Sequence, residues 1–355
     1  PRTGRRGTGE VPVPPGPPRV STPEVLGRTR SLVEPALRAV VEGLSVRLRP
    51  SSTYHFGWTE ADGSPSAMGA GKGLRPTLAV LSAEAVGAPA EVAVPGAVAA
   101  ELVHNFSLVH DDIIDGDTER RHRATVWSAF GTDEAIISGD ALHNLAYQVL
   151  LDDPSPQRQA AAARLTRATA AMIAGQAADM AFDDLPTVTL AECVAMEADK
   201  TGALLAYSAS VGAVLAGATD AQVDALDEFG MELGCAFQAV DDVLGIWGDP
   251  SVTGKAVGND LRERKKSLPV AVVLDQGGEA ADELLAIYGR DGDLTDDDVA
   301  RATSVLEAAG GRSHAESSAG AHLVLALTAL DGLGFDDGAV VDLNDLARFV
   351  ADREF

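Results

Sequence analysis

The sequence predicts an all-α protein, built as one large helical bundle. From residue 24 onward apolar residues recur every three or four positions, alanine is abundant, and no segment alternates with period two. The 355 residues are 46% hydrophobic and 23% charged, which provides enough apolar side chains for a sizeable core. Aromatic residues make up only 5%, so we expect Ala, Val and Leu to build most of this core.

Residues 1–22, PRTGRRGTGEVPVPPGPPRVST, differ from the rest of the chain. They contain six prolines and four arginines against one acid and have no apolar period, which is typical of a disordered segment with polyproline character. They also lack the apolar stretch of a secretory signal. We therefore expect a disordered tail at 1–22, a candidate for binding an unknown partner, and one domain at 23–355.

Charge and cysteine content exclude several classes of protein. The formal net charge of −25 argues against a nucleic-acid partner, because a phosphate backbone requires a basic surface. The two cysteines, Cys193 and Cys235, are too few for a disulfide framework and lack metal-ligand spacing. The expected location is the cytoplasm. The five lysines stand in short segments beside Gly, Asp and Thr, which makes them candidates for binding an anion.

The first expected helix, 24–48, is followed by a loop rich in Gly, Ser and Pro at 49–72. The second helix, 76–87, begins with a proline, which is favoured at the first helical position. The preceding segment GKGLRP places Lys72 and Arg75 just before this helix. A helix N-terminus with flanking cations can bind an anion, and the glycine spacing of a P-loop is absent here.

The third helix, 95–115, ends in the acidic segment HDDIID. Asp111 and Asp115 are four residues apart, so their carboxylates share one helix face, with Asp112 beside them. Like charges at this spacing destabilise a helix unless a cation offsets them. His104 lies two turns before Asp111 on the same face, where a buried structural role is the alternative to a functional one.

Apolar spacing also predicts helices at 133–151, 157–183, 190–218, 220–247, 295–309, 313–331 and 342–353. Residues 202–219 carry no charge, which raises a membrane-spanning alternative. Their Ser, Gly and Tyr content favours a helix buried in the bundle, so no transmembrane segment is expected. Lys200 lies in this apolar helix, where an unpaired ammonium would be costly.

A second acidic cluster, FQAVDD, lies inside the next helix. Gln238 precedes Asp241 by three residues, so both side chains can face one cavity, with Asp242 adjacent. Acids on two helices of a bundle can hold a hard cation that prefers oxygen ligands, and Mg²⁺ also bridges to substrate phosphates. Lys255 and Lys265 follow in sequence. Acids on two helices with cations between them indicate a metal–diphosphate site.

Together these segments resemble the trans-isoprenyl diphosphate synthases, the polyprenyl synthetase family, and within it the geranylgeranyl and farnesyl diphosphate synthases. The matching segments are GKGLRP (71–76), ELVHNFSLVHDDIIDGDTERR (101–121), GD (139–140), GQAAD (175–179), KT (200–201), FQAVDD (237–242) and GKAVGNDLRERKKSLP (254–269). The resemblance covers residues 70–270 well and the C-terminal part more loosely. It implies a helical bundle of the isoprenoid synthase type around a deep central cavity, usually as a homodimer.

The resemblance further implies a Mg²⁺-dependent prenyltransferase that condenses isopentenyl diphosphate with an allylic diphosphate. The implied catalytic residues are Asp111, Asp115, Asp241, Lys200 and Gln238. The implied metal ligands are Asp111, Asp115 and Asp241, with Asp112 and Asp242 in support. The implied allylic diphosphate contacts are Arg120, Lys200, Thr201, Gln238, Lys255 and Lys265. The implied isopentenyl diphosphate contacts are Lys72, Arg75, His104 and Arg121.

The length of the product depends on the residues beneath the first acidic cluster. The growing chain is expected to run along the third helix toward its N-terminus. Ser107, one turn before Asp111, leaves room there, and Phe106 is the nearest bulky residue that could form a floor. This pair resembles archaeal-type geranylgeranyl diphosphate synthases, so the expected product is C20, with C15 as the main alternative. The competing interpretation makes Phe106 ordinary core against a neighbouring helix.

One position departs from the family pattern. The second motif commonly reads DDxxD, whereas this chain has Gly245 in place of the last acid. We expect weaker metal binding on that side. We also expect that Gly245→Asp would leave the enzyme active and lower its Mg²⁺ requirement, because it adds an oxygen ligand one turn from Asp241.

Two other functions use similar residues. A class I terpene cyclase would ionise one prenyl diphosphate and need no isopentenyl site, but the later helix lacks an NxxxSxxxE arrangement. A non-catalytic subunit of a heteromeric prenyl synthase should have lost catalytic cations, and none is missing. Chain growth from isopentenyl diphosphate would distinguish a synthase from both.

Overall fold

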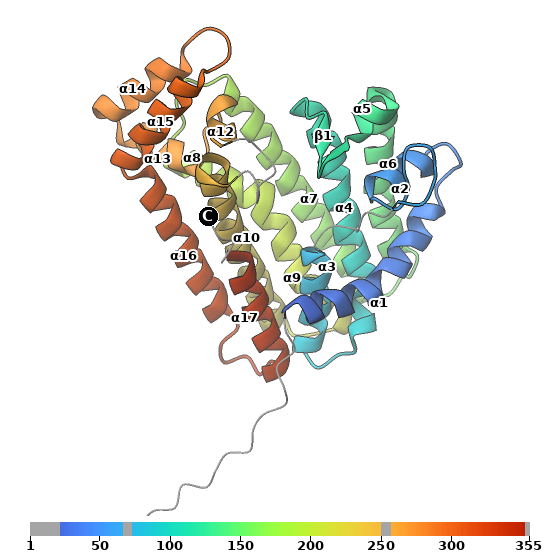
Figure 1. Cartoon of the computed structure of the whole chain (residues 1–355). Helices are drawn as coiled ribbons and strands as arrows, with labels where there is room; N and C mark the ends of the chain where they lie inside the picture. The colour runs from blue at the N-terminus through green and yellow to red at the C-terminus, as the bar shows by residue number, and fades with distance from the viewer. Residues whose placement is uncertain (1–21, 67–72, 250–256, 352–355) are drawn as a thin grey trace, which may run out of the picture.

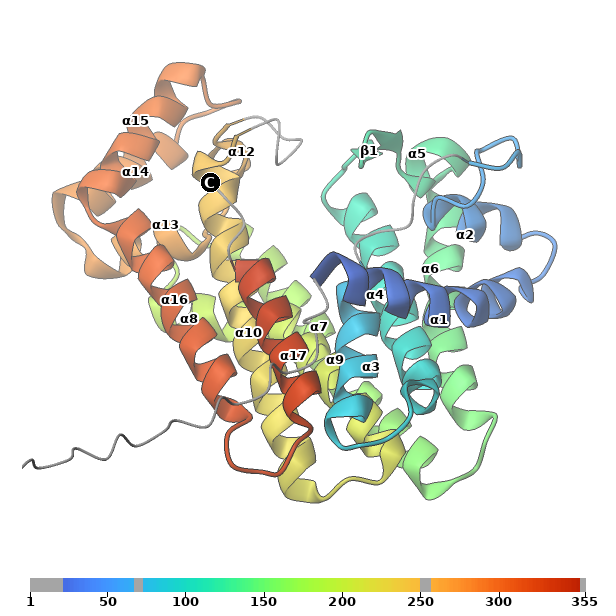
Figure 2. The same cartoon turned by 60° about the horizontal axis from the view of Figure 1, so that its bottom comes forward.

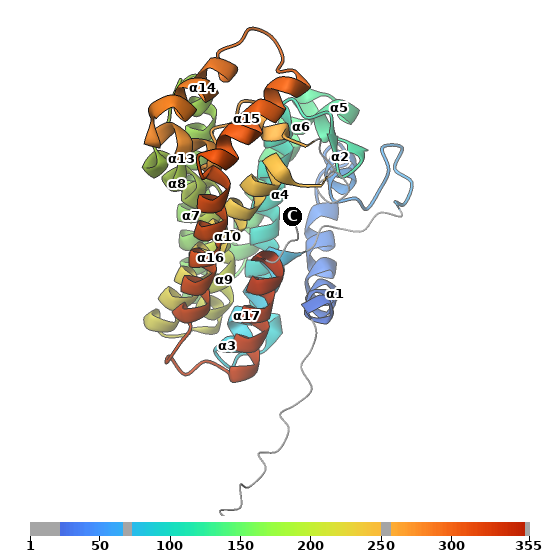
Figure 3. The same cartoon turned by 60° about the vertical axis from the view of Figure 1, so that its left-hand side comes forward.

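The computed structural model describes residues 22–66, 73–249 and 257–351, which form a bundle of long helices lying side by side (Figures 1 and 3). The prediction of an all-α fold is confirmed. The expected tail lies outside the described residues except for Thr22, which begins the first helix. Lys72 and Lys255 also lie outside them.

The helices of the N-terminal half are α1 (Thr22–Glu42), α2 (Arg49–His55), α3 (Leu74–Ala85), η1 (Ala90–Ala93), α4 (Val94–Ile114), α5 (Val126–Phe130), α6 (Thr132–Leu151) and α7 (Pro156–Asp183). Between α4 and α5 a short antiparallel hairpin consists of β1 (Glu119–Arg120) and β2 (Arg123–Ala124). The C-terminal half contains α8 (Leu190–Glu197), the π-helix η2 (Ala198–Gly202), α9 (Ala203–Ala216), α10 (Asp220–Trp247), α12 (Asn259–Arg262), α13 (Leu268–Gln276), α14 (Gly278–Tyr288), α15 (Asp296–Ala308), α16 (Gly311–Ala329) and α17 (Asp337–Ala351).

Several elements were not predicted. The region expected as a loop at 49–72 contains α2, and the region between 247 and 295 contains α12, α13 and α14. The hairpin strands have two residues each, too few to give a period-two pattern. The helix expected at 190–218 is present, but η2 interrupts its α-helical register.

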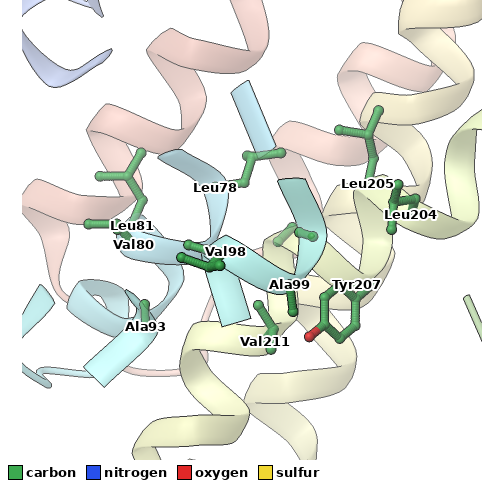
Figure 4. Close-up of a cluster of buried hydrophobic side chains, with 14 of the residues drawn as sticks. Leu78, Val80, Leu81, Ala93, Val98, Ala99, Leu204, Leu205, Tyr207 and Val211 are labelled. Carbon is green, nitrogen blue, oxygen red and sulfur yellow. The ribbon is translucent and has the colours of Figure 1, made fainter. Parts of the chain in front are cut away.

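The centre of the bundle is formed by α3, α4 and α9, whose apolar side chains interdigitate (Figure 4). Leu78, Ala99 and Leu205 illustrate the packing: each is completely buried. A Cβ atom at Gly212 of α9 would lie 2.0 Å from the carbonyl oxygen of Ala79 on α3, so glycine is needed where these two backbones touch. The core is therefore built mostly from aliphatic and small residues, as the low aromatic content predicts, with a few buried aromatic rings such as Tyr207 and Phe229.

The two ends of the described chain pack on the same helix, α3 (Figure 2). Arg28 of α1 forms an ion pair with Glu84 near the end of α3. The backbone N–H of Asp336, just before α17, donates to the carbonyl oxygen of Ala85 at 2.8 Å. Both ends thus brace the helix that carries Arg75.

The helices α4 and α10 run in the same direction, so their C-terminal ends lie at one end of the bundle, near the hairpin and α12 (Figure 1). The two acidic clusters occupy these ends. Within the described residues, one helix, Ala90–Ile114, is long and apolar enough to span a membrane, and most of it is buried inside the bundle. That burial is the behaviour of a core helix. Residues 202–214 of the uncharged stretch are buried as well, as predicted, whereas Gly217 and Thr219 at its end are exposed.

Candidate active site

Asp111 and Asp115 lie at the C-terminal end of α4, where the backbone N–H of Asp115 donates to the carbonyl oxygen of Asp111 at 2.8 Å. Burial raises the pKa of Asp111 to about 6, Lys200 opposes this rise, and the neighbouring Asp115 carboxylate adds to it. Burial also raises the pKa of Asp115, against the opposing charges of Lys265 and Lys200. The two carboxylates are costly to ionise together, and two of the three lysines expected at an allylic diphosphate, Lys200 and Lys265, lie near them.

Asp112 is directed into the protein. Its side chain is 1% exposed and accepts a hydrogen bond from Arg120 Nε at 2.6 Å. Burial raises the pKa of Asp112, and the guanidinium of Arg120 lowers it. The carboxylate is therefore committed to holding Arg120, which places it in support of the site rather than at the open face with Asp111.

The hairpin after α4 presents Arg121. Its turn consists of Arg121 (φ 54°) and His122 (φ 61°), both in the left-handed region that Gly and Asn occupy most easily. Beyond the turn, Arg123 donates to the carbonyl oxygens of Tyr54 and Thr59 at 3.2 and 2.9 Å, which anchors the hairpin to the end of α2 and the loop after it. The anchored turn leaves the Arg121 side chain exposed.

Arg75, His104 and Arg121 form a basic group on the α3 side of the site. Burial lowers the pKa of Arg75 to about 10, although the carboxylates of Glu101 and Asp241 raise it. Burial also lowers the pKa of His104 well below its usual value, and the charges of Arg75 and Arg121 act in the same direction. The structure therefore brings together three of the four residues predicted for isopentenyl diphosphate, while Lys72 lies outside the described residues.

His55, at the end of α2, joins this basic group. Its Nε2 lies 3.0 Å from Oδ1 of Asn105, whose amide nitrogen is occupied by the carbonyl oxygen of Glu101, so His55 donates. Burial and the charges of Arg120 and Arg121 lower the pKa of His55 to about 3. Two hollows, of about 520 and 550 Å³, are both lined by Phe56, Asn105 and Arg121, and the first is also lined by His55.

On α10, the second acidic cluster resembles the first: one aspartate, Asp242, is bonded inside the protein, as Asp112 is in the first cluster. Asp242 is 5% exposed, and its Oδ1 accepts a hydrogen bond from Gln238 Nε2 at 2.7 Å. Its Oδ2 accepts one from the backbone N–H of Leu268 at 2.6 Å. Each carboxylate oxygen accepts a hydrogen bond from the protein, so Asp242 holds Gln238 and the start of α13 in place, and its supporting role at the metal stays a prediction. Asp241 is the ligand candidate of this motif.

Lys200 and Thr201 lie in η2, where the extra residue of the π-turn alters the direction of the side chains. Lys200 forms an ion pair with Asp179 of α7 at 2.5 Å, and Thr201 Oγ1 donates to Gln238 Oε1 at 2.7 Å. A Cβ atom at Gly175 would lie 2.3 Å from the backbone nitrogen of Lys200, so this glycine allows α7 to touch the π-turn. The GQAAD segment thus contributes both a close contact and a counter-ion.

Gly245 faces another carboxylate. A Cβ atom at this position would lie 2.0 Å from Oδ2 of Asp260, which comes from α12. Burial lowers the pKa of Lys265, but the carboxylates of Asp260 and Glu263 raise it above its usual range. The space one turn beyond Asp241 is therefore occupied by an acid from elsewhere in the chain, so a restored acid at 245 requires the Asp260 side chain to move.

Phe106 packs between α4 and α6. Its ring lies 5.1 Å from that of His110 and 4.8 Å from that of His143, which in turn lies 5.1 Å from the ring of Tyr147. Ser107 is half-buried and donates to the carbonyl oxygen of His104 at 2.9 Å, so its hydroxyl group is turned back to its own helix. The structure gives Phe106 aromatic neighbours on α6, as the core interpretation requires, and leaves a small side chain one turn below Asp111.

Residues 64–306 match the family model described as polyprenyl synthetase. The chain belongs to the polyprenyl synthetase family. It is 45% identical over 333 residues to a (2E,6E)-farnesyl diphosphate synthase of Mycobacterium tuberculosis and 42% identical over 332 residues to a geranylgeranyl diphosphate synthase of the same organism, covering 93% of each chain in both comparisons.

Solved structures in this family agree with the fold. A polyprenyl synthetase from Streptomyces coelicolor superposes with a TM-score of 0.87 at 46% identity, over 92% of this chain and 98% of that one. A geranylgeranyl pyrophosphate synthase from Corynebacterium glutamicum, complexed with isoprenyl diphosphate and magnesium, superposes with a TM-score of 0.76 at 26% identity, over 94% and 99%. This polyprenyl synthetase is accordingly a polyprenyl diphosphate synthase, a prenyltransferase of isoprenoid biosynthesis.

The donor groups suit a divalent metal. Asp111 and Asp115 offer oxygen ligands whose ionised forms are disfavoured by burial and by each other, and a cation would relieve both effects. Among the described residues, no three acidic, histidine or cysteine side chains already converge on one point. The carboxylates of a single helix face therefore fit a metal that completes its shell with water and substrate oxygens.

Four residues of the site were not singled out from the sequence: His55, Asp179, Glu197 and Asp260. Asp179 stood in the quoted GQAAD segment, and Asp260 in GNDLRERKKSLP, so the signal for both was their place in a matched motif. His55 lay in a segment expected as a loop, and Glu197 had no pattern around it. Only the folded chain shows that these side chains meet the acidic clusters.

Proposed function

We propose that this polyprenyl diphosphate synthase condenses isopentenyl diphosphate with an allylic diphosphate in a Mg²⁺-dependent reaction, and that its main product is geranylgeranyl diphosphate. The observation that carries the proposal is the separation of two unlike anion sites. One combines the Asp111 and Asp115 carboxylates with lysines, and the other contains arginine and histidine side chains, with the Glu101 and Asp241 carboxylates acting on Arg75.

The first of these sites suits a diphosphate that leaves. Asp111, Asp115 and Asp241 would hold Mg²⁺, which as a Lewis acid offsets the negative charge that develops on a leaving diphosphate. Lys200, Lys265 and Arg120 would bind the diphosphate oxygens directly. Ionisation of the allylic C–O bond leaves an allylic cation, and the interlocked contacts of Thr201, Gln238 and Asp242 keep this face rigid.

The second site suits a diphosphate that stays. Arg75 and Arg121 would bind the isopentenyl diphosphate through their positive charge, so this diphosphate is not activated to leave. The Asp241 carboxylate, which we assign to the metal of the first site, also acts on Arg75.

His104 and His55 remain neutral. The single N–H of neutral His55 is already donated to Asn105, so His104 is the histidine that can donate to the diphosphate. The isopentenyl double bond then attacks the allylic cation, and loss of a proton to the released diphosphate restores an alkene. Proximity of the two sites supplies much of the rate.

A C20 product rests on the residues below Asp111. Ser107 is small and bonded to its own helix, so an extending chain has room beside it. The Phe106 and His143 rings, 4.8 Å apart, would form the floor. Farnesyl diphosphate (C15) is the second candidate, because relatives at similar identity carry either name.

The test is a product assay with isopentenyl diphosphate, Mg²⁺ and each allylic primer from C5 to C15, followed by chain-length analysis. Elongation to C20 supports the proposal. A C15 end point selects the alternative, hydrocarbon from one prenyl diphosphate would indicate a cyclase, and an inactive chain would indicate a non-catalytic subunit. In Phe106→Ala the product should lengthen, whereas Phe130→Leu, which alters an aromatic contact with Tyr54 elsewhere, should leave it unchanged.

We further propose that the chain works as a homodimer in the cytoplasm. Exposed apolar side chains on neighbouring helices α6 and α7 support a subunit interface, among them Ile137 (52% exposed) and Ile173 (49% exposed). Light scattering on the purified chain should give twice the monomer mass of 36.6 kDa. Ile137→Glu should shift the population to monomer, and an unchanged mass in that variant would place the interface elsewhere.

A further inference from the structure

The hairpin that carries Arg121 is held in place by contacts outside its own two strands. Its turn contains only two residues, so Arg120 of β1 pairs directly with Arg123 of β2. A two-residue turn with both residues in the left-handed region fixes the register of the strands on either side. The side chain of Arg121 leaves this turn exposed and lines both hollows of the site. The position of Arg121 therefore depends on the contacts that hold the strands.

Arg123 joins the hairpin to the end of α2 and the segment that follows it. Its side chain is 15% exposed, and its guanidinium group donates to the carbonyl oxygens of Tyr54 and Thr59 at 3.2 and 2.9 Å. It also donates to a carboxylate oxygen of Glu60 at 3.1 Å. The guanidinium carbon lies 4.2 Å from the centre of the Tyr54 ring, which adds a cation–π contact. Because the guanidinium is planar and rigid, this set of contacts fixes both the place and the direction of β2.

Tyr54 provides a second contact to the same strand. Its side chain is 6% exposed, and its hydroxyl group donates to the carbonyl oxygen of Ala124 at 2.7 Å. Its ring packs edge-on against Phe130 of α5, with the ring centres 5.2 Å apart. The end of α2 therefore holds two successive residues of β2, and it does so through side chains that are not assigned to either substrate.

Arg120, on the other strand, is held by a different element. Its Nε donates to the buried carboxylate of Asp112 on α4 at 2.6 Å. The contacts of Arg120 with α4 and those of Arg123 with α2 share no partner residue. Loss of the Arg123 contacts should therefore release the turn and Arg121, while Asp112 keeps Arg120 in place.

We propose that Arg123 is a positioning residue for isopentenyl diphosphate: by binding the end of α2 it fixes the turn that presents Arg121, and Tyr54 supports it. The effect falls on one substrate, because Arg120, the hairpin residue assigned to the allylic diphosphate, is held separately by Asp112. The inference rests on the proposed function and on the place of Arg121 in it. It adds a residue that touches neither substrate and that acts through Arg121.

The test compares four single variants with the wild-type chain. Arg123→Met keeps the apolar stem and removes every donor, Arg123→Lys keeps the charge, and Tyr54→Phe removes one hydrogen bond to the hairpin. Arg38→Met is the matched control, because Arg38 also lies over an aromatic ring, 4.4 Å from that of Trp58, and pairs with Glu34 of its own helix at 2.8 Å. Each variant is assayed for kcat, for KM with both substrates and for melting temperature, at a temperature where all of them are folded.

We expect Arg123→Met to raise the KM for isopentenyl diphosphate by about tenfold or more, with kcat and the KM for the allylic substrate within about threefold of wild type. Arg123→Lys should recover part of this loss, and Tyr54→Phe should raise the same KM by about threefold. Arg38→Met should match the wild type. The proposal would be overturned by an allylic KM that rises as much as the isopentenyl KM in Arg123→Met, or by an isopentenyl KM no higher than in Arg38→Met.

A double variant tests whether Arg123 acts through Arg121. In the Arg121→Ala background, Arg123→Met should raise the isopentenyl KM by less than about twofold, because the residue that it positions is already gone. An equal rise in both backgrounds would overturn the proposal. If Arg123→Met does not fold, Tyr54→Phe is taken through the same comparison and decides. A wild-type chain that elongates no primer would instead contradict the proposed function itself.

Discussion

At the scale of single residues, each acidic motif gives its neighbouring aspartates different tasks. Asp111 lies at the open face beside Lys200, while Asp112 is buried and paired with Arg120. We expect Asp111→Asn to lower turnover by about 10²–10³-fold, because it removes a charge needed only when the diphosphate leaves. Its melting temperature should stay the same or rise, since ionised Asp111 is disfavoured by burial.

Asp112→Asn should behave in the opposite way. It removes the charge that pairs with Arg120, whose side chain is 31% exposed, and is expected to destabilise the fold by about 1 kcal/mol, measured by urea unfolding. Turnover should fall less than in Asp111→Asn. Equal stability losses in the two variants would show that the division of tasks is mistaken.

The contact between Gly245 and Asp260 yields a second prediction at this scale. Gly245→Asp puts a carboxylate into the space that Asp260 occupies, so like charges meet at close range. We expect lower Mg²⁺-dependent turnover and a lower melting temperature. The double variant Gly245→Asp/Asp260→Ala should recover part of both, and Asp260→Ala alone serves as its control. A fully active single variant would mean that Asp260 moves aside freely.

At the scale of elements, the hairpin after α4 stores backbone strain in its turn. His122 has a φ of 61°, where a side chain costs about 1 kcal/mol relative to glycine. His122→Gly should therefore stabilise the chain by about that amount against urea, less the extra freedom glycine gives the unfolded state. Turnover should be retained, because Arg123 still anchors the hairpin and Arg121 keeps its place. A destabilised variant would indicate that the His122 side chain makes a favourable contact.

The long helices could be predicted from the sequence because their apolar period extends over many residues. The helices expected at 95–115, 133–151, 157–183 and 220–247 all exist with ends displaced by few residues. Short elements such as α2 and α5 span two turns or fewer, so a period cannot emerge. The π-turn could not be predicted for another reason. One extra residue leaves the apolar composition unchanged and alters only the phase of the apolar period.

The same contrast holds for the site. The spacing of acids four residues apart, such as Asp111 and Asp115, predicts from sequence alone that their side chains share one helix face. His55, Glu197 and Asp260 reach the site through tertiary packing from α2, α8 and α12, which no local spacing encodes. The sequence predicted that Asp242 belongs to the site, but it did not predict which groups its carboxylate oxygens contact.

At the scale of the whole molecule, the buried neutral histidines make stability depend on pH. The pKa of His55 falls from 6.5 to about 3 on folding, so below pH 6.5 the unfolded chain takes up a proton that the folded chain refuses. Stability should therefore decrease as the pH falls from 6.5. His55→Gln, which keeps a donor for Asn105, should lose about 1 kcal/mol less than wild type between pH 6.5 and 5.5. Parallel urea-unfolding curves for the two proteins would contradict a neutral, buried His55.

The π-helix limits how this protein can vary through evolution. A π-turn contains one residue more than an α-turn, so converting it to α-helix without a deletion would rotate one side of the helix by about 100° relative to the other. Such a step would turn Lys200 and Thr201 away at once, while Gly212 still holds α9 against α3. Point substitutions cannot reach the same end gradually. Descendants of this chain can therefore exchange the side chains around the turn, but they keep or lose the register of the helix in a single step.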